Sequence, residues 1–525
     1  MNHLRLSFAA ALAAAAVATV PAVAPTAALA SSTQESVFQD DDLLLHGEPA
    51  QVSETLDTMA ALGVDRLRLS LLWRTIAPLP EQDVDVDGFD ATDPGAYPQG
   101  VWDRHDLVIR EAQARGIKVN LTVSGPAPDW ATGTPERAEL DETFDPDAKA
   151  YGQFLQAAGK RYGGSFTGGD GRPLPRVESW SIWNEPNQPG WLTPQWAKDP
   201  RSADAQIETS PRIYRALVDE GVAALRSTGH EHDTILIGET APKGVRVKGE
   251  SRAIAPGPFI RRLYCLGDDL KTLKGSTAEL LGCPVDGDAK KVMSEHPGLF
   301  GATGFAHHPY ELVRSPSASP GDRDFFTIAN LSALSTLLRK VNAAFGRKGG
   351  IPLYLTEYGY QTRPPDPNGV SQANQAKFLD ESEYRTWRDK GVRSLAQFLL
   401  DDDEPREADG FGTTFQTGLR TQDGKPKPAF TSYGTPIWLP SPKLRGRSLR
   451  VWGLARAAKG RPKVQVLVRS RGAKRFRVAR TVTGTTRGYV DTRITVRRSG
   501  SVRLRWRHPD GGLRQSRIAP FSVRP

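Results

Sequence analysis

The segment from Trp180 to Trp191 reads Trp-Ser-Ile-Trp-Asn-Glu-Pro-Asn-Gln-Pro-Gly-Trp, and the rest of the chain is arranged around it. Residues 177–183 have the length and apolar character of a buried strand, which the proline at position 186 then ends. Glu185 is therefore expected at the carboxyl end of a strand. In parallel α/β sheets, this end carries the residues that bind ligands and perform chemistry.

A second apolar run, residues 351–356, leads into Glu357, and Gly359 then interrupts the strand. Two glutamates at the ends of apolar strands indicate a pair of carboxylates that face one cleft. Cleavage of a glycosidic bond requires such a pair, because one group protonates the leaving oxygen while the other attacks the sugar or activates water. The two glutamates are the first candidates for catalytic residues.

Strand and helix patterns alternate from residue 43 to about residue 440, which predicts a parallel sheet with crossover helices. The expected strands are 43–46, 66–73, 117–123, 177–183, 234–238, 304–310, 351–357 and 393–400. The expected helices are 54–62, 105–115, 148–162, 211–226, 328–345 and 372–390. Eight parallel strands close as a (β/α)8 barrel, so all eight carboxyl ends open on one face.

The motifs around the two glutamates resemble those of a known family. Trp183-Asn-Glu-Pro186 together with Thr356-Glu-Tyr-Gly359 is similar to the retaining glycoside hydrolases of clan A, the (β/α)8-barrel superfamily that contains families 5 and 39 and cellulase-like enzymes. The resemblance extends over roughly residues 42–440. It implies that Glu185 is the general acid/base and Glu357 the nucleophile, with carboxyl groups about 5 to 5.5 Å apart.

Four further residues match the site of that family. Arg68, in the second strand, matches an arginine whose charge keeps the nucleophile ionised. Tyr310 matches a phenol that hydrogen-bonds the nucleophile, and His308, two residues earlier, matches a histidine that lines the sugar site. Asn184 matches the asparagine that bonds the sugar 2-hydroxyl, a contact that strengthens in the transition state.

These assignments have structural alternatives. Arg68 could be a barrel residue that pairs with an acid. Of the adjacent histidines His307 and His308, one could pack beneath the barrel, and the spacing to Tyr310 favours His308 for the site. An isolated Asn-Glu-Pro is a common turn sequence, so the catalytic interpretation of Glu185 depends on the aromatic residues around it and on the second glutamate.

For three tryptophans near strand ends, two interpretations stay open. They are core aromatics, or they are platforms on which the apolar faces of sugar rings stack: Trp73, Trp130 and Trp191. The chain also departs from the family pattern twice. Residues 123–125 (Val-Ser-Gly) stand where several members carry a histidine, and Phe398 stands where many carry a tryptophan. Both departures bear on the substrate and the subfamily.

The positive charge of the chain is concentrated near its C-terminus. Residues 441–525 contain 24 Lys and Arg but only two acids, so this part carries a net charge of +22 and the rest −13. Short alternating runs separated by Gly and Ser predict a small, basic, sandwich-like all-β domain with arginines on its solvated face. We expect it to bind an anionic cell-envelope polymer rather than nucleic acid; a solubilising module is the alternative.

The first thirty residues predict a secretory signal peptide. Arg5 lies in a short polar start, an alanine-rich apolar run covers residues 8–23, and Ala28-Leu-Ala30 precedes the expected cleavage point. A membrane anchor is the alternative, although prolines interrupt the run. No later segment has about 18 uninterrupted apolar residues, so no membrane span is expected. The expected domains are thus a signal peptide (1–30), a barrel (31–440) and a basic β domain (441–525).

Cys265 and Cys283 are the two cysteines of the chain. An even number in an exported protein predicts a disulfide, with two free buried thiols as the alternative. Two cysteines do not make a zinc cluster, and we expect neither a metal nor another cofactor because the proposed chemistry needs none.

The sequence therefore predicts an exported retaining β-glycosidase or endoglycanase that acts on an oligo- or polysaccharide. We expect a monomer that is secreted or held at the cell surface. Two other functions stay open: a transglycosylase, which shares every catalytic residue, and a glycan- or wall-binding barrel that has lost activity. The joint presence of Glu185, Glu357, Arg68 and Tyr310 argues against lost activity, because binding alone does not need that arrangement.

Overall fold

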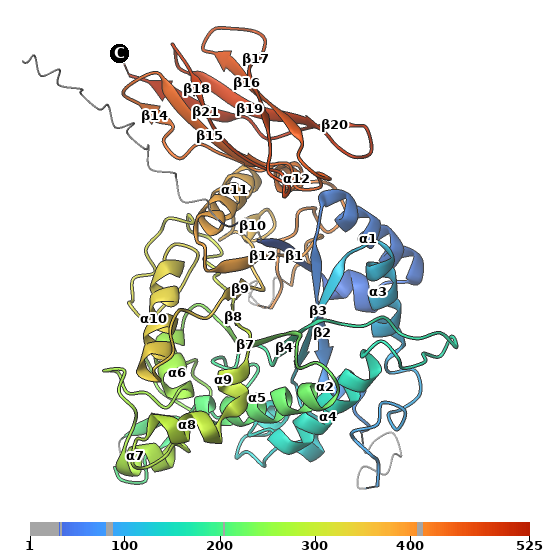
Figure 1. Ribbon diagram of the computed structural model, residues 1–525, viewed down its shortest axis with the longest axis vertical. Coiled ribbons are helices and arrows are strands. Elements are labelled where there is room, and N and C mark those ends of the chain that lie inside the picture. The colour runs from blue at the N-terminus through green and yellow to red at the C-terminus, as the bar shows by residue number, and fades with distance from the viewer. Residues whose placement is uncertain (1–30, 32–33, 80–87, 203–204, 407–412, 525) are drawn as a thin grey trace, which may run out of the picture.

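The computed structural model describes residues 31, 34–79, 88–202, 205–406 and 413–524. The expected signal peptide, residues 1–30, lies outside the described residues. Figure 1 shows a barrel ringed by helices, with a β-rich unit in orange and red beside α11 and α12. Within the described part of the chain, no helix combines the length and the apolar character needed to cross a membrane.

The barrel is closed by eight strands, all parallel, in the order β1-β12-β9-β8-β7-β4-β3-β2. Their bounds are Glu35–Gln39 (β1), Arg66–Leu72 (β2), Lys118–Ser124 (β3), Ser179–Ile182 (β4), Thr234–Thr240 (β7), Gly304–His307 (β8), Leu353–Leu355 (β9) and Val392–Phe398 (β12). The predicted (β/α)8 barrel is confirmed.

The helices that cross between these strands also agree with the sequence periodicity. Long helices are α1 (Pro49–Leu62), α3 (Asp103–Ala114), α4 (Ala148–Arg161), α5 (Ser210–Ser227), α10 (Leu331–Ala344) and α11 (Gln372–Arg388). Shorter ones are α2 (Trp73–Ile76), α6 (Pro256–Leu263), α7 (Gly275–Leu280), α8 (Ala289–Glu295), α9 (Pro297–Gly301) and α12 (Pro428–Gly434). Two small sheets pair β5 (Trp196–Lys198) with β6 (Gln206–Glu208) and β10 (Thr362–Arg363) with β11 (Val370–Ser371).

The prediction for the first strand was wrong. Residues 43–46 belong to a π-helical turn, Asp42–His46, and the first strand is β1, Glu35–Gln39. Within the turn Leu44 is buried while its neighbours are partly exposed, so this leucine run covers the core with one side chain. A search for apolar runs misses β1 because three of its five residues are polar, although four of the five are buried.

The C-terminal unit is a pair of β sheets around a core of its own. One sheet contains β13 (Ile437–Trp438), β15 (Ser448–Leu454) and β18 (Tyr489–Thr495). The other contains β14 (Lys443–Leu444), β16 (Lys463–Ser470), β17 (Arg477–Thr483), β19 (Gly500–Arg507), β20 (Leu513–Gln515) and β21 (Ala519–Val523). The predicted small all-β domain after the barrel is confirmed.

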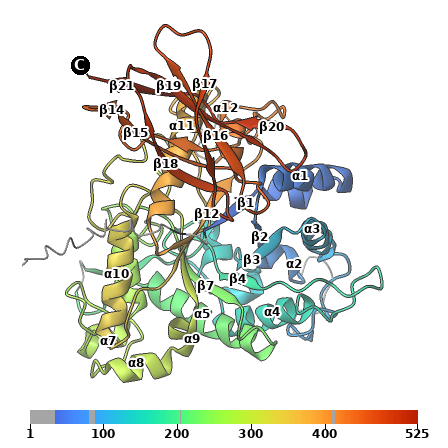
Figure 2. The same cartoon turned by 45° about the horizontal axis from the view of Figure 1, so that its top comes forward.

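This β unit packs against the helices of the barrel, as Figure 2 also shows. Trp452 and Tyr489 form an aromatic cluster with Tyr384 and Trp387 of α11. Arg456 is buried and forms an ion pair of 2.8 Å with Glu383 of the same helix. Apolar and charged contacts therefore join the two units.

The cysteines form the predicted disulfide, Cys265–Cys283, with Cα atoms 5.8 Å apart. It closes the segment that follows α6 and contains α7. From α5, the buried Arg215 reaches into this segment and donates to the carbonyls of Leu263 (3.0 Å) and Gly282 (3.2 Å). A covalent bond and a buried guanidinium thus hold the same segment.

Candidate active site

A cavity of about 560 Å³ opens at the carboxyl ends of the barrel strands. Residues on or just after seven of the eight strands line it, among them Arg68, Asn184, Glu185, Tyr310, Glu357 and Phe398. The barrel topology explains this convergence, because parallel strands bring all their carboxyl ends to one face.

Glu185 and Glu357 meet in this cavity. Glu185 lies three residues after the end of β4, and Glu357 lies two residues after the end of β9. Carboxylate oxygens of the two side chains approach within 4.8 Å of each other. Both side chains keep an exposed edge, 19% for Glu185 and 13% for Glu357, so a ligand in the cavity can reach them. The strand-end pattern in the sequence correctly brought them together.

Two donors hold the Glu357 carboxylate. Arg68 Nη1 donates to Oε1 at 2.6 Å, and the Tyr310 hydroxyl donates to Oε2 at 3.1 Å. Arg68 is buried, which would lower its pKa, but the attraction of Glu239 and of Glu357 more than offsets burial and raises it. Both oxygens of Glu357 thus accept a hydrogen bond from a fixed donor.

His308 bridges Glu185 to a third carboxylate. Its Nδ1 lies 2.8 Å from Glu185 Oε1, and its Nε2 lies 2.7 Å from Oε2 of Glu239. Burial would lower the pKa of His308, but the nearby Glu357 charge and the bonds to Glu185 and Glu239 outweigh it and raise the pKa to about 10. The neighbouring His307 faces away, to the Thr240 hydroxyl and the Phe326 carbonyl, and burial lowers its pKa to about 3.

Sequence reasoning missed Glu239, which lies near the end of β7 and is fully buried. Its Oε2 receives Arg68 Nη2 at 3.3 Å and the Thr356 hydroxyl at 2.6 Å, in addition to His308. Burial would raise its pKa, but the charge of Arg68 and the bond from His308 lower it to about 2. A signal was present: the apolar run 235–237 ends in Gly-Glu, a third glutamate at a strand tip.

Gln39, at the end of β1, was missed as well. Its Oε1 accepts from Arg68 Nη1 at 2.6 Å, while Asn184 Oδ1 accepts from Arg68 Nη2 at the same distance. Arg68 therefore joins four strand ends of the barrel. Asn184 reaches the cavity wall as expected, with its amide oxygen bound by the arginine.

The strand ends next to the glutamates adopt an uncommon backbone conformation. Trp183, Glu185 and Glu239 have positive φ angles of 66°, 35° and 41°. Such angles are rare for non-glycine residues and concentrate at functional sites, where surrounding contacts must hold them. Here they turn the chain out of the sheet just where the carboxylates begin.

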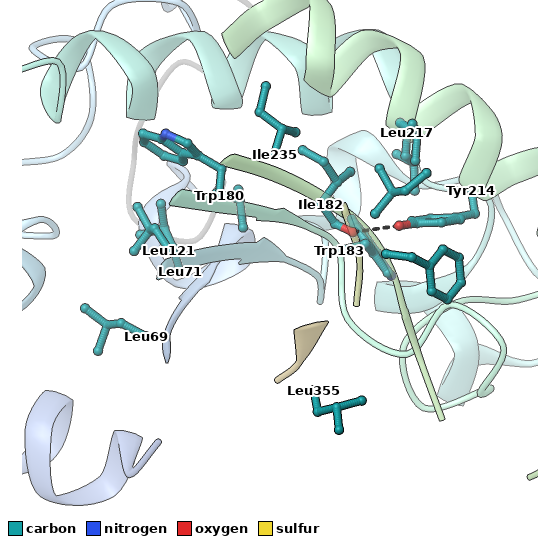
Figure 3. Packing of buried hydrophobic residues seen from close by; sticks show 14 of the residues in the cluster. Leu69, Leu71, Leu121, Trp180, Ile182, Trp183, Tyr214, Leu217, Ile235 and Leu355 are labelled. Atoms are coloured by element: carbon teal, nitrogen blue, oxygen red, sulfur yellow. Dashed lines mark hydrogen bonds between the residues drawn. The ribbon is translucent and has the colours of Figure 1, made fainter. Parts of the chain in front are cut away.

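Two buried tyrosines hold the strands together at these positions. The Tyr151 hydroxyl donates to the Val123 carbonyl (2.6 Å) and accepts from the Trp183 amide (3.2 Å). The Tyr214 hydroxyl, drawn in Figure 3, donates to the Ile182 carbonyl (3.0 Å) and accepts from the Gly238 amide (2.7 Å). The Trp183 amide also donates to the Val123 carbonyl at 2.8 Å, so the phenol of Tyr151 adds to the last backbone bond between these strands.

The three tryptophans take different positions. Trp191 lines the cavity, where a sugar ring could stack on it. Trp73 is only 1% exposed and packs on Trp130 and Phe154, so it is a core aromatic. Trp130 lies edge-on to Trp73 and donates its Nε1 hydrogen to the Pro78 carbonyl. A platform role is thus left to Trp191 alone among the three.

The two departures from the family pattern have local explanations. A side chain at position 125 would come within 2.6 Å of the Trp183 ring, so the indole fills the space beside the end of β3. At the end of β12, Phe398 lines the cavity and meets Phe415 edge-on, with ring centroids 5.3 Å apart. An aromatic wall is therefore present, built from two phenylalanines.

Glu185, His308 and Glu357 come nearest to a set of metal ligands among the described residues, with one possible ligand atom each within 4.8 Å of the others. The fit is poor, because both nitrogens of His308 already face carboxylate oxygens. A protonated imidazole has no lone pair to give to a cation.

Neither a family model nor a curated protein matches the sequence. Among solved structures, an exo-β-1,4-mannosidase from an Opitutaceae bacterium shares 13% identity and a TM-score of 0.40, over 76% of this chain and 58% of the mannosidase. A GH5_18 protein from Bifidobacterium longum shares 13% and 0.44, over 77% and 78% of the two chains. A β-glucuronidase from Bacteroides uniformis shares 9% and 0.41, over 94% and 46%. At this level, the similarities carry no information about the substrate.

Proposed function

We propose that the protein is an exported retaining β-glycosidase that cleaves O-glycosyl bonds by double displacement. The pairing of Glu185 with Glu357 carries the proposal. Their oxygens approach within 4.8 Å, which suits a retaining enzyme, whereas an inverting enzyme separates its carboxyl groups by about 6.5 to 9.5 Å to admit a water molecule.

The different surroundings of the two glutamates assign their roles. Glu357 accepts from the arginine and the phenol, so it stays ionised and attacks the anomeric carbon to form a glycosyl-enzyme. Glu185, bonded to His308, protonates the leaving oxygen and then deprotonates the incoming water. Asn184 lines the same cavity, and we assign to it the contact with the sugar 2-hydroxyl.

Hydrolysis of a panel of aryl β-glycosides tests this function. The panel comprises glucoside, xyloside, mannoside, galactoside and cellobioside, with transglycosylation products measured alongside release of the chromophore. We expect wild type to cleave at least one of them and Glu357→Ala to lose about 10⁴-fold or more, as for other nucleophile deletions. An inactive wild type that is nevertheless retained on one glycan would replace the enzyme by a binding protein.

Export rests on the N-terminal sequence and agrees with the disulfide, since disulfides persist in oxidising compartments. N-terminal sequencing of protein from the culture medium or the cell surface should begin at Ser31. Protein that stays inside the cell with Met1 retained would contradict export.

The basic β unit, in our proposal, binds an anionic envelope polymer. The specific observation is that the guanidinium groups of Arg469 and Arg503 lie over the ring of Phe476, at 4.8 and 4.4 Å. Arg505 lies on the same strand as Arg503, and burial together with the charges of Arg505 and Arg469 lowers the pKa of Arg503. An anion placed here would relieve this repulsion while stacking keeps the guanidinium planes ordered.

Binding of the intact protein to teichoic acid, to polygalacturonate and to duplex DNA tests the β unit across a salt series. We expect one of the two envelope-type polymers to bind, with affinity falling as salt rises. The pair Arg469→Gln and Arg503→Gln should weaken binding about tenfold or more, and the control pair Arg447→Gln and Arg524→Gln, on exposed sites, much less. Equal loss in both pairs, or preference for DNA, would contradict the proposal.

A further inference from the structure

We propose that Glu239 is a positioning residue that keeps a mobile proton in the hydrogen bond between His308 and Glu185. The inference rests on the proposed function, because this proton is the one that Glu185 gives to the leaving group. Glu239 itself is fully buried and does not line the cavity, so it acts through other residues.

The first support is the geometry of the His308 ring. Its two nitrogens face Glu239 Oε2 at 2.7 Å and Glu185 Oε1 at 2.8 Å. An ionised carboxylate only accepts hydrogen bonds, so Glu239 fixes a proton on Nε2. Nδ1 is then the nitrogen that shares a proton with Glu185. Without Glu239, nothing would prevent the ring from carrying its single proton on Nδ1 and leaving Nε2 bare.

The second support is a backbone connection between the same residues. The amide of Glu185 donates to the carbonyl of Glu239 at 3.0 Å, and both residues have positive φ angles. Tyr214 holds the preceding residues of the two strands, Ile182 and Gly238. Glu239 therefore holds the acid/base at both ends, by its carbonyl at the backbone and through His308 at the carboxylate.

The charged and titratable groups around His308 come from five strand ends. They are Glu185 after β4, Glu239 on β7, Tyr310 and His307 at β8, Glu357 after β9, and Arg68 on β2. The Oε2 atom of Glu357 lies 3.6 Å from Nδ1 of His308. Arg68 contacts both Glu239 and Glu357, so one cation serves two of the three carboxylates. Three carboxylates thus face one arginine, and the negative charge that the arginine does not balance favours a proton shared by His308 and Glu185.

The proton shared by His308 and Glu185 is given up in the first half of the reaction and regained in the second. In the first half, the proton moves from Nδ1 through Glu185 to the leaving oxygen while the glycosidic bond breaks and Glu357 bonds the anomeric carbon. In the second half, water bonds that carbon, the bond to Glu357 breaks, and a proton from the water returns to the pair. The proton on Nε2 stays with Glu239 throughout.

Glu239→Gln tests the proposal, because the amide keeps the shape and removes the charge. Loss of the proton shared by His308 and Glu185 should set the alkaline limb of the pH profile of kcat/KM. In the variant, the midpoint of this limb should fall by about one pH unit or more. At alkaline pH the variant should lose about tenfold or more on an aryl glycoside with a poor leaving group. A dinitrophenyl glycoside, whose departure needs no proton, should lose much less.

Glu383→Gln is the matched control, since Glu383 is a buried, arginine-paired carboxylate remote from the cavity. It should lower stability and leave the alkaline limb in place. Equal losses on both leaving groups in Glu239→Gln, with an unmoved limb, would overturn the proposal and leave Glu239 a purely structural acid.

The ¹⁵N chemical shifts of the histidine rings give a readout that needs neither substrate nor a folded variant. In wild type, the His308 ring should keep its Nε2 proton and titrate above pH 8, well above the usual value for histidine. A His308 ring that titrates near the ordinary value would overturn the proposal. An inactive wild type with the expected titration would refute the proposed function alone.

Discussion

Arg68 is the residue on which the candidate site depends most. It is 1% exposed and contacts Gln39, Asn184, Glu239 and Glu357. Both Nη atoms of this buried guanidinium have acceptors, two of them on carboxylates, which is needed because an unpaired buried charge is very costly. The arrangement fixes several strand ends relative to one another and places a positive charge against the Glu357 carboxylate.

The Tyr310 hydroxyl is the second donor to Glu357, so its removal gives a direct test of nucleophile stabilisation. A hydrogen bond to a charged group contributes about 1.5–3 kcal/mol, and Tyr310→Phe should therefore lower kcat/KM about 10- to 100-fold. Steady-state kinetics on the best aryl glycoside measures the loss, and circular dichroism checks the fold.

Tyr358→Phe is the control for that variant. Tyr358 is buried and its hydroxyl bonds Ser382 at 2.7 Å, with no carboxylate involved. This substitution should leave kcat/KM within about threefold of wild type. Similar losses in the two variants would show that Tyr310 acts by packing rather than by its bond to Glu357.

At the same scale, sequence reasoning found the residues that stand in recognisable motifs. Glu185 and Glu357 follow apolar runs and carry motif neighbours, so their proximity was predictable. The apolar pattern does not reveal Glu239, because it predicts a strand that ends at Gly238, whereas β7 continues to Thr240. The role of Glu239 depends on contacts with Arg68 and His308 that lie far away in sequence.

Among the elements, the strands that carry the site end where the chain leaves the sheet. Parallel strands of three to seven residues form the barrel, and tyrosines from α4 and α5 bond the backbone where the ladder stops. The sheet thus supplies a rigid support, and the turns after the strands direct the side chains into the cavity. Periodicity predicted these strands well and failed for β1, whose burial comes with polar side chains.

The disulfide segment provides a prediction at the scale of elements. Cys265 and Cys283 are 18 residues apart, and a cross-link of that span stabilises by about 3 kcal/mol in chain-entropy models. The double variant Cys265→Ser and Cys283→Ser should lower the free energy of unfolding by that amount in urea titrations.

None of the residues 265–283 lines the cavity, so the same variant should keep its activity at 25 °C. Reduced wild type serves as the control and should match the double variant in stability. An unchanged free energy of unfolding in both would mean that Arg215 and the packing of this segment suffice without the covalent bond.

In the whole molecule, three ion pairs join the barrel and the basic β unit, and the pair of Arg456 with Glu383 is the most buried of the three. Arg456 pairs with Glu383 and lies 4.1 Å from the centre of the Tyr433 ring. Arg517 pairs with Asp380 at 2.6 Å, and Arg487 pairs with Asp65 at 2.8 Å. These contacts cross between the two units and predict that they unfold together.

Arg456→Met tests this coupling. Removal of one partner from a buried pair leaves the other charge unpaired, which costs about 3–5 kcal/mol. We expect calorimetry to show a single transition in wild type and a clearly lower melting temperature in the variant. Arg450→Met, which removes a partly exposed pair with Asp491, should cost at most about 1 kcal/mol.

Two separate transitions, with Arg456→Met affecting only one, would show instead that the units unfold independently. The sequence predicted a distinct basic β unit from its charge and alternation but not its contacts with the barrel. Those contacts involve single arginines such as Arg456, which composition cannot distinguish from the exposed arginines around them.

The most direct test of the central claim is the anomeric configuration of the glycosyl azides formed by Glu357→Ala and Glu185→Ala, measured by ¹H NMR with an activated aryl β-glycoside. Azide replaces the missing nucleophile in the first variant and should give the inverted α-azide. In the second variant, it attacks the glycosyl-enzyme and should give the retained β-azide. Exchanged configurations, or no azide product from either variant of an active enzyme, would contradict the roles assigned to the two glutamates.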